Sequence, residues 1–229
     1  MNVGQFKEIC SLMSACGLVD EFSINENGHF IGTDSGKTFI ADLEYPNNLP
    51  VKTNIVNVKG MMQTLTLFKD DVEVEISDGR IKINDDITFA SIVLSAAEPT
   101  KFNLPPLTDA DYEIIVNKVS PTMFNSIGRL RPEAMINEYY FLFTSNNRLM
   151  IHIGEDSGSF VGTKIADVVE VNKDKSDDSK MAKYTMNVAE CFKNIKTDAS
   201  IKIIADKIMT VNCDPGPYNV TYYLAPRVD

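Results

Sequence analysis

Residues 222–229 read YYLAPRVD, an aromatic and apolar run that meets a proline and ends among charged residues. A frayed, solvated tail has a polar composition instead. The apolar side chains therefore predict a strand that stops at Pro226 and lies against another part of the protein.

Upstream, short turn pairs divide the apolar runs into hairpins. Asn27-Gly28, Asp78-Gly79 and Asn146-Asn147 each separate two β-rich segments, and such pairs tolerate the left-handed backbone of tight hairpins. Asp206-Lys207 marks a fourth hairpin less clearly. About a dozen strands are expected from these patterns.

Four short stretches have helical periodicity instead. The spacing groups Phe6, Ile9, Cys10 and Met13 on one face of the first stretch, and Val188, Cys191, Phe192 and Ile195 are the apolar positions of the last. Gly17 is expected to stop the first helix, and Ser120 with Pro121 to open the third. The four helices are predicted over roughly 3–16, 57–68, 120–131 and 187–196.

The order of these elements repeats. Residues 4–95 and 111–224 each contain two helices and two hairpins, and the three prolines of residues 96–111 indicate an extended connector. We predict an α+β protein with two similar domains, residues 1–98 and 111–229, joined by residues 99–110. Each domain should pack two helices on antiparallel sheets.

Composition narrows the class of protein. The chain has 229 residues, 44% of them apolar, and no apolar run approaches the roughly 18 residues of a membrane span. Its first residues lack the apolar block of a signal peptide, so we expect a cytoplasmic protein without a membrane partner. Four cysteines without a Cys-x-x-Cys pair and only two histidines argue against a zinc site. No metal or cofactor is expected.

The net charge of −10 should repel nucleic acid. The predicted helices, however, contain six bases and two acids, a net charge of +4, which leaves −14 on the rest of the chain. The bases are therefore sorted onto the helices. They are Lys7, Lys59, Arg129, Arg131, Lys193 and Lys196.

The ending resembles the C-terminal signature of sliding clamps of the proliferating-cell-nuclear-antigen family, in which Leu-Ala-Pro precedes a base, a β-branched residue and an acid. The repeated halves, the connector and the basic helices agree with this resemblance. Residues 57–76 (NVKGMMQTLTLFKDDVEVEI) and the chain length are similar to clamps of T-even-type bacteriophages, which act in the host cytoplasm. Two features depart from cellular clamps: the strand before the first helix is missing or very short, and the helices carry fewer bases.

The resemblance implies a DNA polymerase processivity factor without catalytic residues. Three chains would form a homotrimeric ring around double-stranded DNA, opened by an ATP-dependent clamp loader. Twelve helices spaced about 8–10 Å apart leave a bore of roughly 20–28 Å, enough for a B-form duplex. The six bases would attract phosphates without reading base sequence.

The resemblance also implies a hydrophobic pocket for peptides of the polymerase and other partners. One side would be Tyr223, Leu224, Ala225 and Pro226, and the other would be Leu104 and Leu107 of the connector. Only one of Tyr223 and Leu224 should face the pocket, because side chains alternate along a strand. Ring closure would use exposed sheet edges, for which residues 86–95 and 159–166 are the candidates.

Two segments resemble motifs of enzymes, but each departs from its motif more than the ending departs from the clamp signature. Residues 32–38 (GTDSGKT) resemble a phosphate-binding loop, but three residues separate the glycines where four are needed, and a strand pattern follows. Residues 155–159 (EDSGS) resemble the nucleophile segment of serine proteases, whose triad needs a histidine base, yet His29 and His152 lie in strand patterns.

Two acidic pairs, Asp70-Asp71 and Asp85-Asp86, suit solvated turns better than metal sites.

Two alternatives to a ring clamp stay open. One is a clamp-fold processivity factor that binds as a monomer, and the other is an interaction scaffold without a role on DNA.

Overall fold

The computed structural model describes residues 1–25, 28–46, 52–95, 106–129, 138–144, 148–154, 160–166, 170–171, 181–185 and 187–227. The chain divides into two compact units. Unit 1 comprises Met1–Asn103 with Pro217–Val220, and unit 2 comprises Leu104–Gly216 with Thr221–Asp229. The domain boundaries predicted from the sequence stay a prediction, because most of the connector lies outside the described residues.

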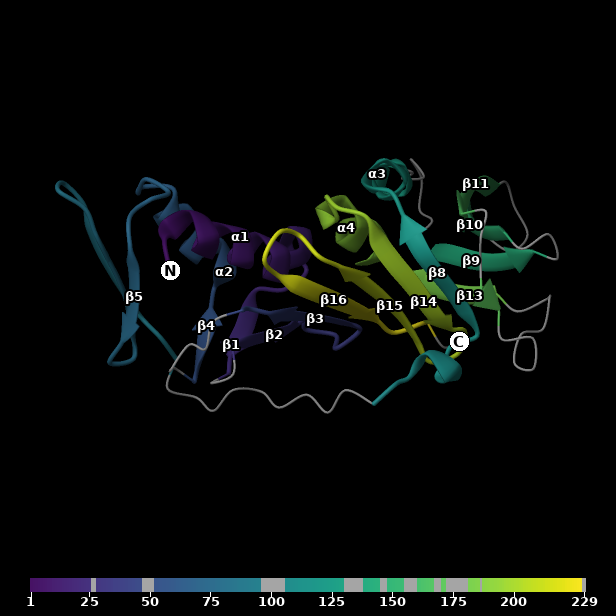
Figure 1. Cartoon of the computed structure of the whole chain (residues 1–229), viewed down its shortest axis with the longest axis horizontal. Coiled ribbons are helices and arrows are strands. Elements are labelled where there is room, and N and C mark those ends of the chain that lie inside the picture. The colour runs from purple at the N-terminus through teal and green to yellow at the C-terminus, as the bar shows by residue number, and fades with distance from the viewer. Residues whose placement is uncertain are drawn as a thin grey trace. The chain divides into compact units, whose positions relative to one another are not determined.

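Unit 1 contains two helices and two antiparallel sheets (Figure 1). One sheet has the order β3-β2-β1-β4 and the other β5-β6-β7. In chain order the elements are α1 (Val3–Ser14), the 3-10 turn η1 (Ala15–Gly17), β1 (Glu21–Ile24), β2 (His29–Thr33), β3 (Phe39–Glu44), β4 (Thr53–Val56), α2 (Val58–Leu65), β5 (Val74–Ser77), β6 (Arg80–Asn84) and β7 (Phe89–Val93).

The core of unit 1 lies between α1 and the larger sheet. Phe6, Ile9 and Met13 of α1 are fully buried, and α1 contacts β2, β3 and α2. Strand β3 alternates buried residues with half-buried or exposed ones, as expected for a strand with one face in the core. These are the apolar positions that the helical periodicity selected for the first helix.

Unit 2 also combines two helices with antiparallel strands. Its sheets have the orders β12-β8-β14-β15-β16 and β11-β10-β9-β13. The elements are η2 (Asp109–Asp111), β8 (Ile114–Val119), α3 (Pro121–Arg129), β9 (Glu138–Thr144), β10 (Arg148–Gly154), β11 (Phe160–Ala166), β12 (Glu170–Val171), β13 (Met181–Thr185), α4 (Asn187–Asn194), β14 (Ala199–Ile204), β15 (Ile208–Cys213) and β16 (Asn219–Leu224).

An aromatic contact joins the two helices of unit 2. The rings of Phe124 in α3 and Phe192 in α4 meet edge to face, with centroids 4.8 Å apart, and both side chains are fully buried. At the end of α4, the buried Asn194 amide donates a hydrogen bond of 2.9 Å to the Tyr222 hydroxyl of β16. This bond satisfies both polar groups inside the core.

The expected α+β class, with two helices in each unit and antiparallel sheets, is confirmed, and so are the four helices. The hairpin at Asp78-Gly79 is also confirmed, since both residues have positive φ angles (53° and 68°) between β5 and β6. Residues 26–27 and 145–147 lie outside the described residues. Sixteen strands are described where about a dozen were expected, because β4, β12 and β13 were not recognised.

The end of α1 corrects one prediction. The helix stops at Ser14, because Ala15 and Cys16 already adopt left-handed φ angles of 41° and 58° before Gly17 at 97°. Gly17 therefore completes a left-handed turn that begins two residues earlier.

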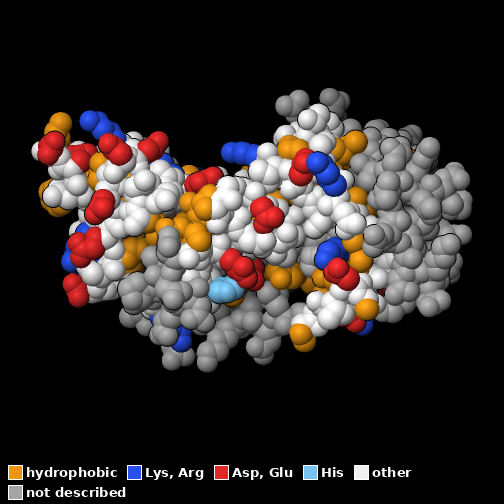
Figure 2. Space-filling view, in the orientation of Figure 1, with side chains coloured by type: hydrophobic (Ala, Val, Ile, Leu, Met, Phe, Trp, Pro, Cys, Tyr) orange, Lys and Arg blue, Asp and Glu red, His pale blue; other side chains and the backbone are white. Residues whose placement is uncertain are grey.

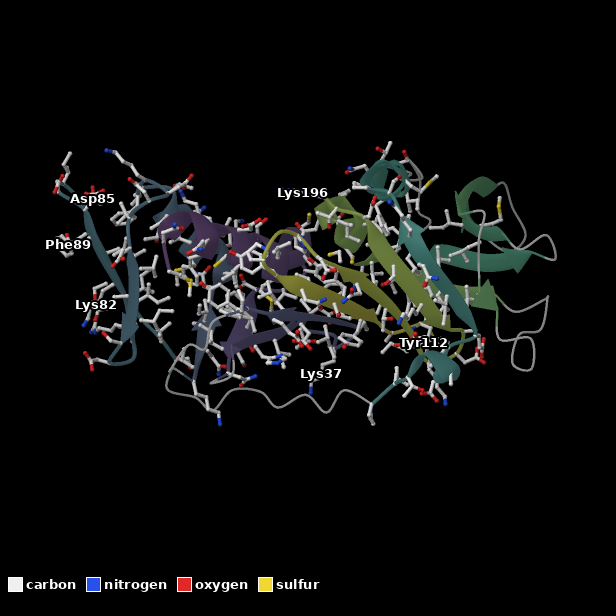
Figure 3. The ribbon with its side chains drawn as sticks, viewed as in Figure 1. Lys37, Lys82, Asp85, Phe89, Tyr112 and Lys196 are labelled. Carbon is white, nitrogen blue, oxygen red and sulfur yellow. The ribbon has the colours of Figure 1, made fainter. Side chains whose placement is uncertain are left out.

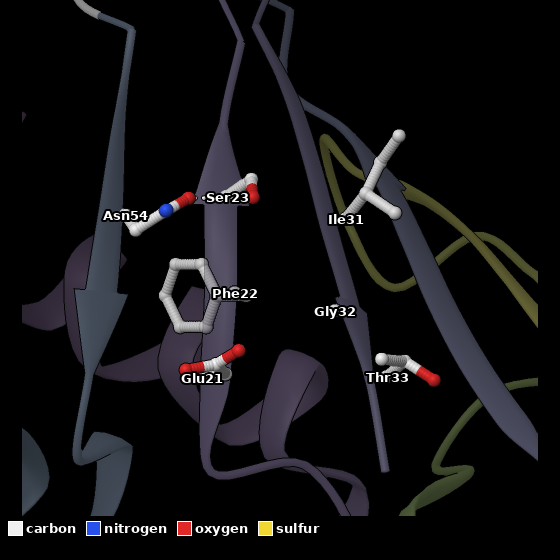
Figure 4. Close-up of a pocket in the computed structure, with 7 residues that line it drawn as sticks. All are labelled: Glu21, Phe22, Ser23, Ile31, Gly32, Thr33 and Asn54. Carbon is white, nitrogen blue, oxygen red and sulfur yellow. Dashed lines mark hydrogen bonds between the residues drawn. The ribbon is translucent and has the colours of Figure 1, made fainter. Parts of the chain in front are cut away.

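A glycine allows close packing in the larger sheet of unit 1. A β-carbon at Gly32 would lie 2.6 Å from Val19 Cγ1, so only glycine fits there. Gly32 also borders a hollow between β1, β2 and β4, where the Ser23 hydroxyl donates to Asn54 Oδ1 (Figure 4). Its volume of about 10 Å³ holds no more than a water molecule.

A histidine and two carboxylates meet on strands β2 and β3. His29 Nδ1 lies 3.5 Å from Asp42 Oδ1, and its Nε2 lies 3.9 Å from Glu44 Oε1. Asp42 Oδ1 is buried and accepts no hydrogen bond within the described part of the chain. Burial raises the pKa of Asp42 above its ordinary value, and the proximity of His29 offsets part of this effect.

Replacing Asp42 by asparagine should stabilise the protein at neutral pH. Because folding raises the pKa of Asp42, the ionised carboxylate is disfavoured in the folded state. That penalty is absent below the unfolded-state pKa, develops as the pH rises through the folded-state pKa, and then stays constant. The gain in unfolding free energy of Asp42→Asn should therefore be largest near pH 7 and vanish below about pH 4.

Chemical denaturation of both proteins across this pH range measures the effect. Glu44→Gln is the control, since Glu44 is exposed and its replacement should change stability little. A variant Asp42→Asn that is less stable than the parent at pH 7 would contradict the prediction.

Candidate nucleic-acid interface

Helix α1 presents one of the predicted DNA-binding bases. Asn2 and Gln5 form a capping box that starts the helix and places Lys7 one turn later. Lys7 Nζ donates to Asp70 Oδ1 at 2.6 Å and to the Phe68 carbonyl at 3.3 Å. Asp70 therefore neutralises the charge of Lys7 within unit 1.

Helix α2 presents Lys59 to solvent. Asn57 adopts a left-handed φ angle of 60°, and its Oδ1 accepts the Gly60 N–H at 2.8 Å, which caps the helix. The buried residues of α2 are Val58, Met61 and Leu65, on the side opposite the exposed Lys59. Lys59 forms no ion pair with a described residue.

Helix α3 begins as predicted, with Pro121 in the first position and the Ser120 hydroxyl accepting the Met123 N–H at 3.3 Å. Arg129 is the last residue of this helix. Arg131 lies outside the described residues.

Helix α4 carries one paired lysine, and an unpaired lysine follows it. Lys193 Nζ lies 2.9 Å from Glu190 Oε1, one turn away, so the two charges cancel. Lys196 follows the end of the helix, is exposed (Figure 3), and has no ion pair within the described residues. The Glu190–Lys193 pair joins residues three positions apart, whereas Asp70 is 63 residues from Lys7 in the chain.

The ending forms strand β16, in which the alternation of side chains decides their exposure. Tyr222 and Leu224 are buried, while Tyr223 is half-buried. Beyond the strand, Ala225 is exposed and Pro226 half-buried, and the Arg227 N–H donates to the Lys183 carbonyl at 2.8 Å. Leu224 therefore belongs to the core, and Tyr223, Ala225 and Pro226 have side chains at the surface.

The end of the connector is held against unit 2. Leu107 is partly buried against the cluster of Tyr112, Ile115 and Ile204. The neighbouring turn is fixed by a capping box in which the Asp111 carboxylate accepts the N–H and hydroxyl of Thr108. Leu104 lies outside the described residues.

The segment that resembles a phosphate-binding loop has another structure. The Asp34 carboxylate accepts the N–H groups of Thr38 and Phe39 at 2.7 and 2.8 Å, so these donors are not available to a phosphate. Strand β3 follows instead of a helix. Residues 155–159, the protease-like segment, lie outside the described residues.

The described part of the chain contains neither a metal site nor a membrane-spanning helix. It contains no group of three or more histidine, cysteine or acidic residues able to hold a metal ion. None of its helices is long and apolar enough to cross a membrane.

Strand β7 is an edge strand of its sheet within the part of the chain that the structure describes. The Asp85 N–H donates to the Thr88 carbonyl and the Leu94 N–H to the Gly79 carbonyl, at the two ends of the β6–β7 ladder. Because bonded pairs alternate along an antiparallel ladder, Phe89, Ser91 and Val93 direct their backbone groups away from β6. Ser95 has the same parity, and its N–H indeed donates away from β6, to the Asn54 carbonyl.

Comparisons with known proteins identify the fold. No family model matches the chain, and no curated protein matches it by sequence. The structure of proliferating cellular nuclear antigen (PCNA) from Entamoeba histolytica aligns with a TM-score of 0.74 and 13% identity, over 99% of this chain and 96% of that one.

Two further PCNA structures give similar values. The PCNA2–PCNA3 complex from Sulfolobus tokodaii aligns with a TM-score of 0.74 and 13% identity, over 100% of this chain and 98% of that one. The PCNA of A. fulgidus, solved with the C-terminal region of FEN-1 bound, aligns with a TM-score of 0.73 and 12% identity, over 100% and 97%. The chain therefore has the α+β clamp fold of PCNA over its full length.

Proposed function

We propose that this chain is a sliding clamp: a non-catalytic processivity factor that encircles double-stranded DNA as a homotrimeric ring and tethers DNA polymerase. The full-length PCNA fold is the observation that carries this proposal. Three chains would supply the twelve helices that the ring requires, and an ATP-dependent clamp loader would open it. Membership of the T-even-type phage clamps stays a prediction from the sequence.

Ring closure would pair β7 with β11 of a second copy. Both are edge strands in their sheets, and both fall within the segments predicted from the sequence. Phe89 is 80% exposed and Val93 64%, beside outward-facing backbone groups. An apolar edge of this kind favours pairing with another strand, since it leaves both apolar surface and backbone groups in water.

Blocking the outward N–H of β7 should prevent assembly. Ser91→Pro removes a donor that β6 does not use, so the hairpin should persist while a second strand is deprived of its central hydrogen bond. Native mass spectrometry over a concentration series should show a trimer for the parent and a monomer for this variant. Ser91→Ala, which keeps the N–H and removes only the hydroxyl bonded to Arg80, should remain trimeric.

A trimeric Ser91→Pro protein would exclude β7 from the interface. A parent that stays monomeric at high concentration would favour the alternative, a clamp-fold factor or scaffold that forms no ring by itself. Thermal unfolding of both variants shows whether their fold is intact.

DNA contact would depend mainly on the lysines that have no partner. Lys59 and Lys196 are exposed and unpaired within the described residues, while Lys7 and Lys193 are engaged by Asp70 and Glu190. A phosphate must compete with these carboxylates for the paired lysines. Few free charges spread over several helices would attract the duplex without fixing it in one position, which suits sliding.

Removal of the free lysines should reduce the salt dependence of duplex binding. For Lys59→Ala with Lys196→Ala, the slope of log affinity against log salt should fall by roughly one for each phosphate that is no longer neutralised. Lys7→Ala with Lys193→Ala removes the same charge and should change the slope less. Fluorescence anisotropy with a labelled duplex measures the salt dependence of both double variants. Equal slopes for the two variants would contradict the prediction that the unpaired lysines contribute more than the paired ones.

Partner peptides would bind at the C-terminal surface. Tyr223, Ala225 and Pro226 offer side chains at this surface, and Leu107 closes the connector side in the proposed pocket. Leu104 completes the set predicted from the sequence. Leu224 would support this surface from the core, because it is only 2% exposed.

Tyr223→Ala with Pro226→Gly should weaken binding of the DNA polymerase from the same source without changing the mass of the ring. Leu224→Ala is the contrast: truncation of a buried leucine should lower the unfolding free energy by about 2–5 kcal/mol. Titration by surface plasmon resonance and a denaturation curve separate the two effects. Unchanged polymerase affinity in the double variant would remove this surface from the proposal.

A further inference from the structure

The tip of the β6–β7 hairpin borders a groove that the proposed clamp activity does not use. Its walls are Lys69 with residues 71–73 on one side and residues 84–87 on the other, all within unit 1, and its volume is about 410 Å³. We call it the hairpin groove. Figure 3 marks its hairpin wall by Asp85, with Phe89 farther along the same hairpin.

The hairpin groove is strongly acidic. Four carboxylates line it, from Asp71, Glu73, Asp85 and Asp86, against the single ammonium of Lys69. Asp71, Glu73 and Asp86 are exposed and form no ion pair with a described residue. Lys69 compensates only part of the mutual repulsion among the four carboxylates, and a cationic ligand would relieve the rest.

An apolar side chain stands in the same wall. Ile87 is 94% exposed, the highest value among the large apolar residues of the described chain, and Val72 is half-buried in the opposite wall. Figure 2 shows acidic and hydrophobic side chains side by side over this part of unit 1. A ligand with both cationic and apolar groups would match this surface, whereas a simple ion would leave Ile87 in water.

Both walls are fixed before any ligand binds. The Asp85 carboxylate accepts the N–H groups of Ile87 and Thr88 at 2.8 and 2.6 Å, and these bonds lower the pKa of Asp85. On the other side, the Val3 and Gly4 N–H groups donate to the carbonyls of Val72 and Asp70. Binding would therefore require little ordering of the protein.

We propose that the hairpin groove binds a short basic segment of a partner protein. Lysine or arginine side chains would lie among the four carboxylates, and one apolar side chain would cover Ile87. Nucleic acid does not suit the site, because its phosphates are repelled by these carboxylates. A second copy of the chain suits it poorly, since that copy carries a net charge of −10.

A labelled peptide of alternating lysine and leucine is the probe, measured by fluorescence anisotropy against the full chain. Asp71→Asn with Asp86→Asn should weaken its binding by roughly threefold to tenfold, the scale of two exposed ion pairs. Ile87→Ser should also weaken it, while the parent should bind a lysine–serine peptide less well than the lysine–leucine peptide. Asp20→Asn with Glu21→Gln, two exposed acids elsewhere in unit 1, is the control for net charge.

The proposal is overturned if the control variant weakens binding as much as the groove variant does, since general attraction to an acidic protein then explains binding. It is also overturned if Ile87→Ser binds the lysine–leucine peptide as the parent does. A change of native mass in the groove variant with unchanged peptide affinity would assign the groove to a second copy instead. None of these results depends on whether the chain forms a ring on DNA.

Discussion

Burial of one helix face against other elements of its unit is the constraint on which the rest of the structure depends. The four helices have only 8 to 12 residues each, too short to be stable alone in water. Their stability must come from side chains such as Phe6 in α1 and the Phe124–Phe192 pair in unit 2. Once these faces are buried, the charged residues of each helix are directed to the opposite side.

Local acids then decide which of those charges are available. Lys7 and Lys193 face a carboxylate at 2.6 and 2.9 Å, while Lys59 and Lys196 have none among the described residues. A basic helix face in the sequence is therefore a weaker source of positive potential than a count of lysines implies. Weak attraction of this kind would suit the proposed sliding clamp, which would have to stay on DNA and still move along it.

The edge strands of the sheets are a second feature of this fold that bears on its interactions. Antiparallel sheets that do not close into a barrel leave unpaired backbone groups, and here β7 combines such groups with exposed apolar side chains. Pairing between chains and binding of a basic partner in the hairpin groove would use adjacent but separate parts of this sheet. The outward backbone of Phe89–Val93 would serve the first, and the acidic walls beside Ile87 the second.

Periodicity and turn chemistry determined much of the fold without tertiary information. Ser120-Pro121 and Asp78-Gly79 act through contacts within a few residues, so the start of α3 and the β5–β6 hairpin could be read directly. The apolar faces of α1 and α4 followed from spacing alone. Strands β4, β12 and β13 were missed, because they are short and no turn pair marks them.

Only the tertiary structure decided what depends on residues far apart in the chain. The Lys7–Asp70 pair, the packing of Leu107 on Ile204, and the edge position of β7 all require elements that the sequence separates by many residues. The C-terminal strand depends on both sequence and tertiary structure. Alternation along the strand predicted that Tyr223 and Leu224 face opposite ways, but which of them is buried depends on the position of the core, and the folded chain buries Leu224.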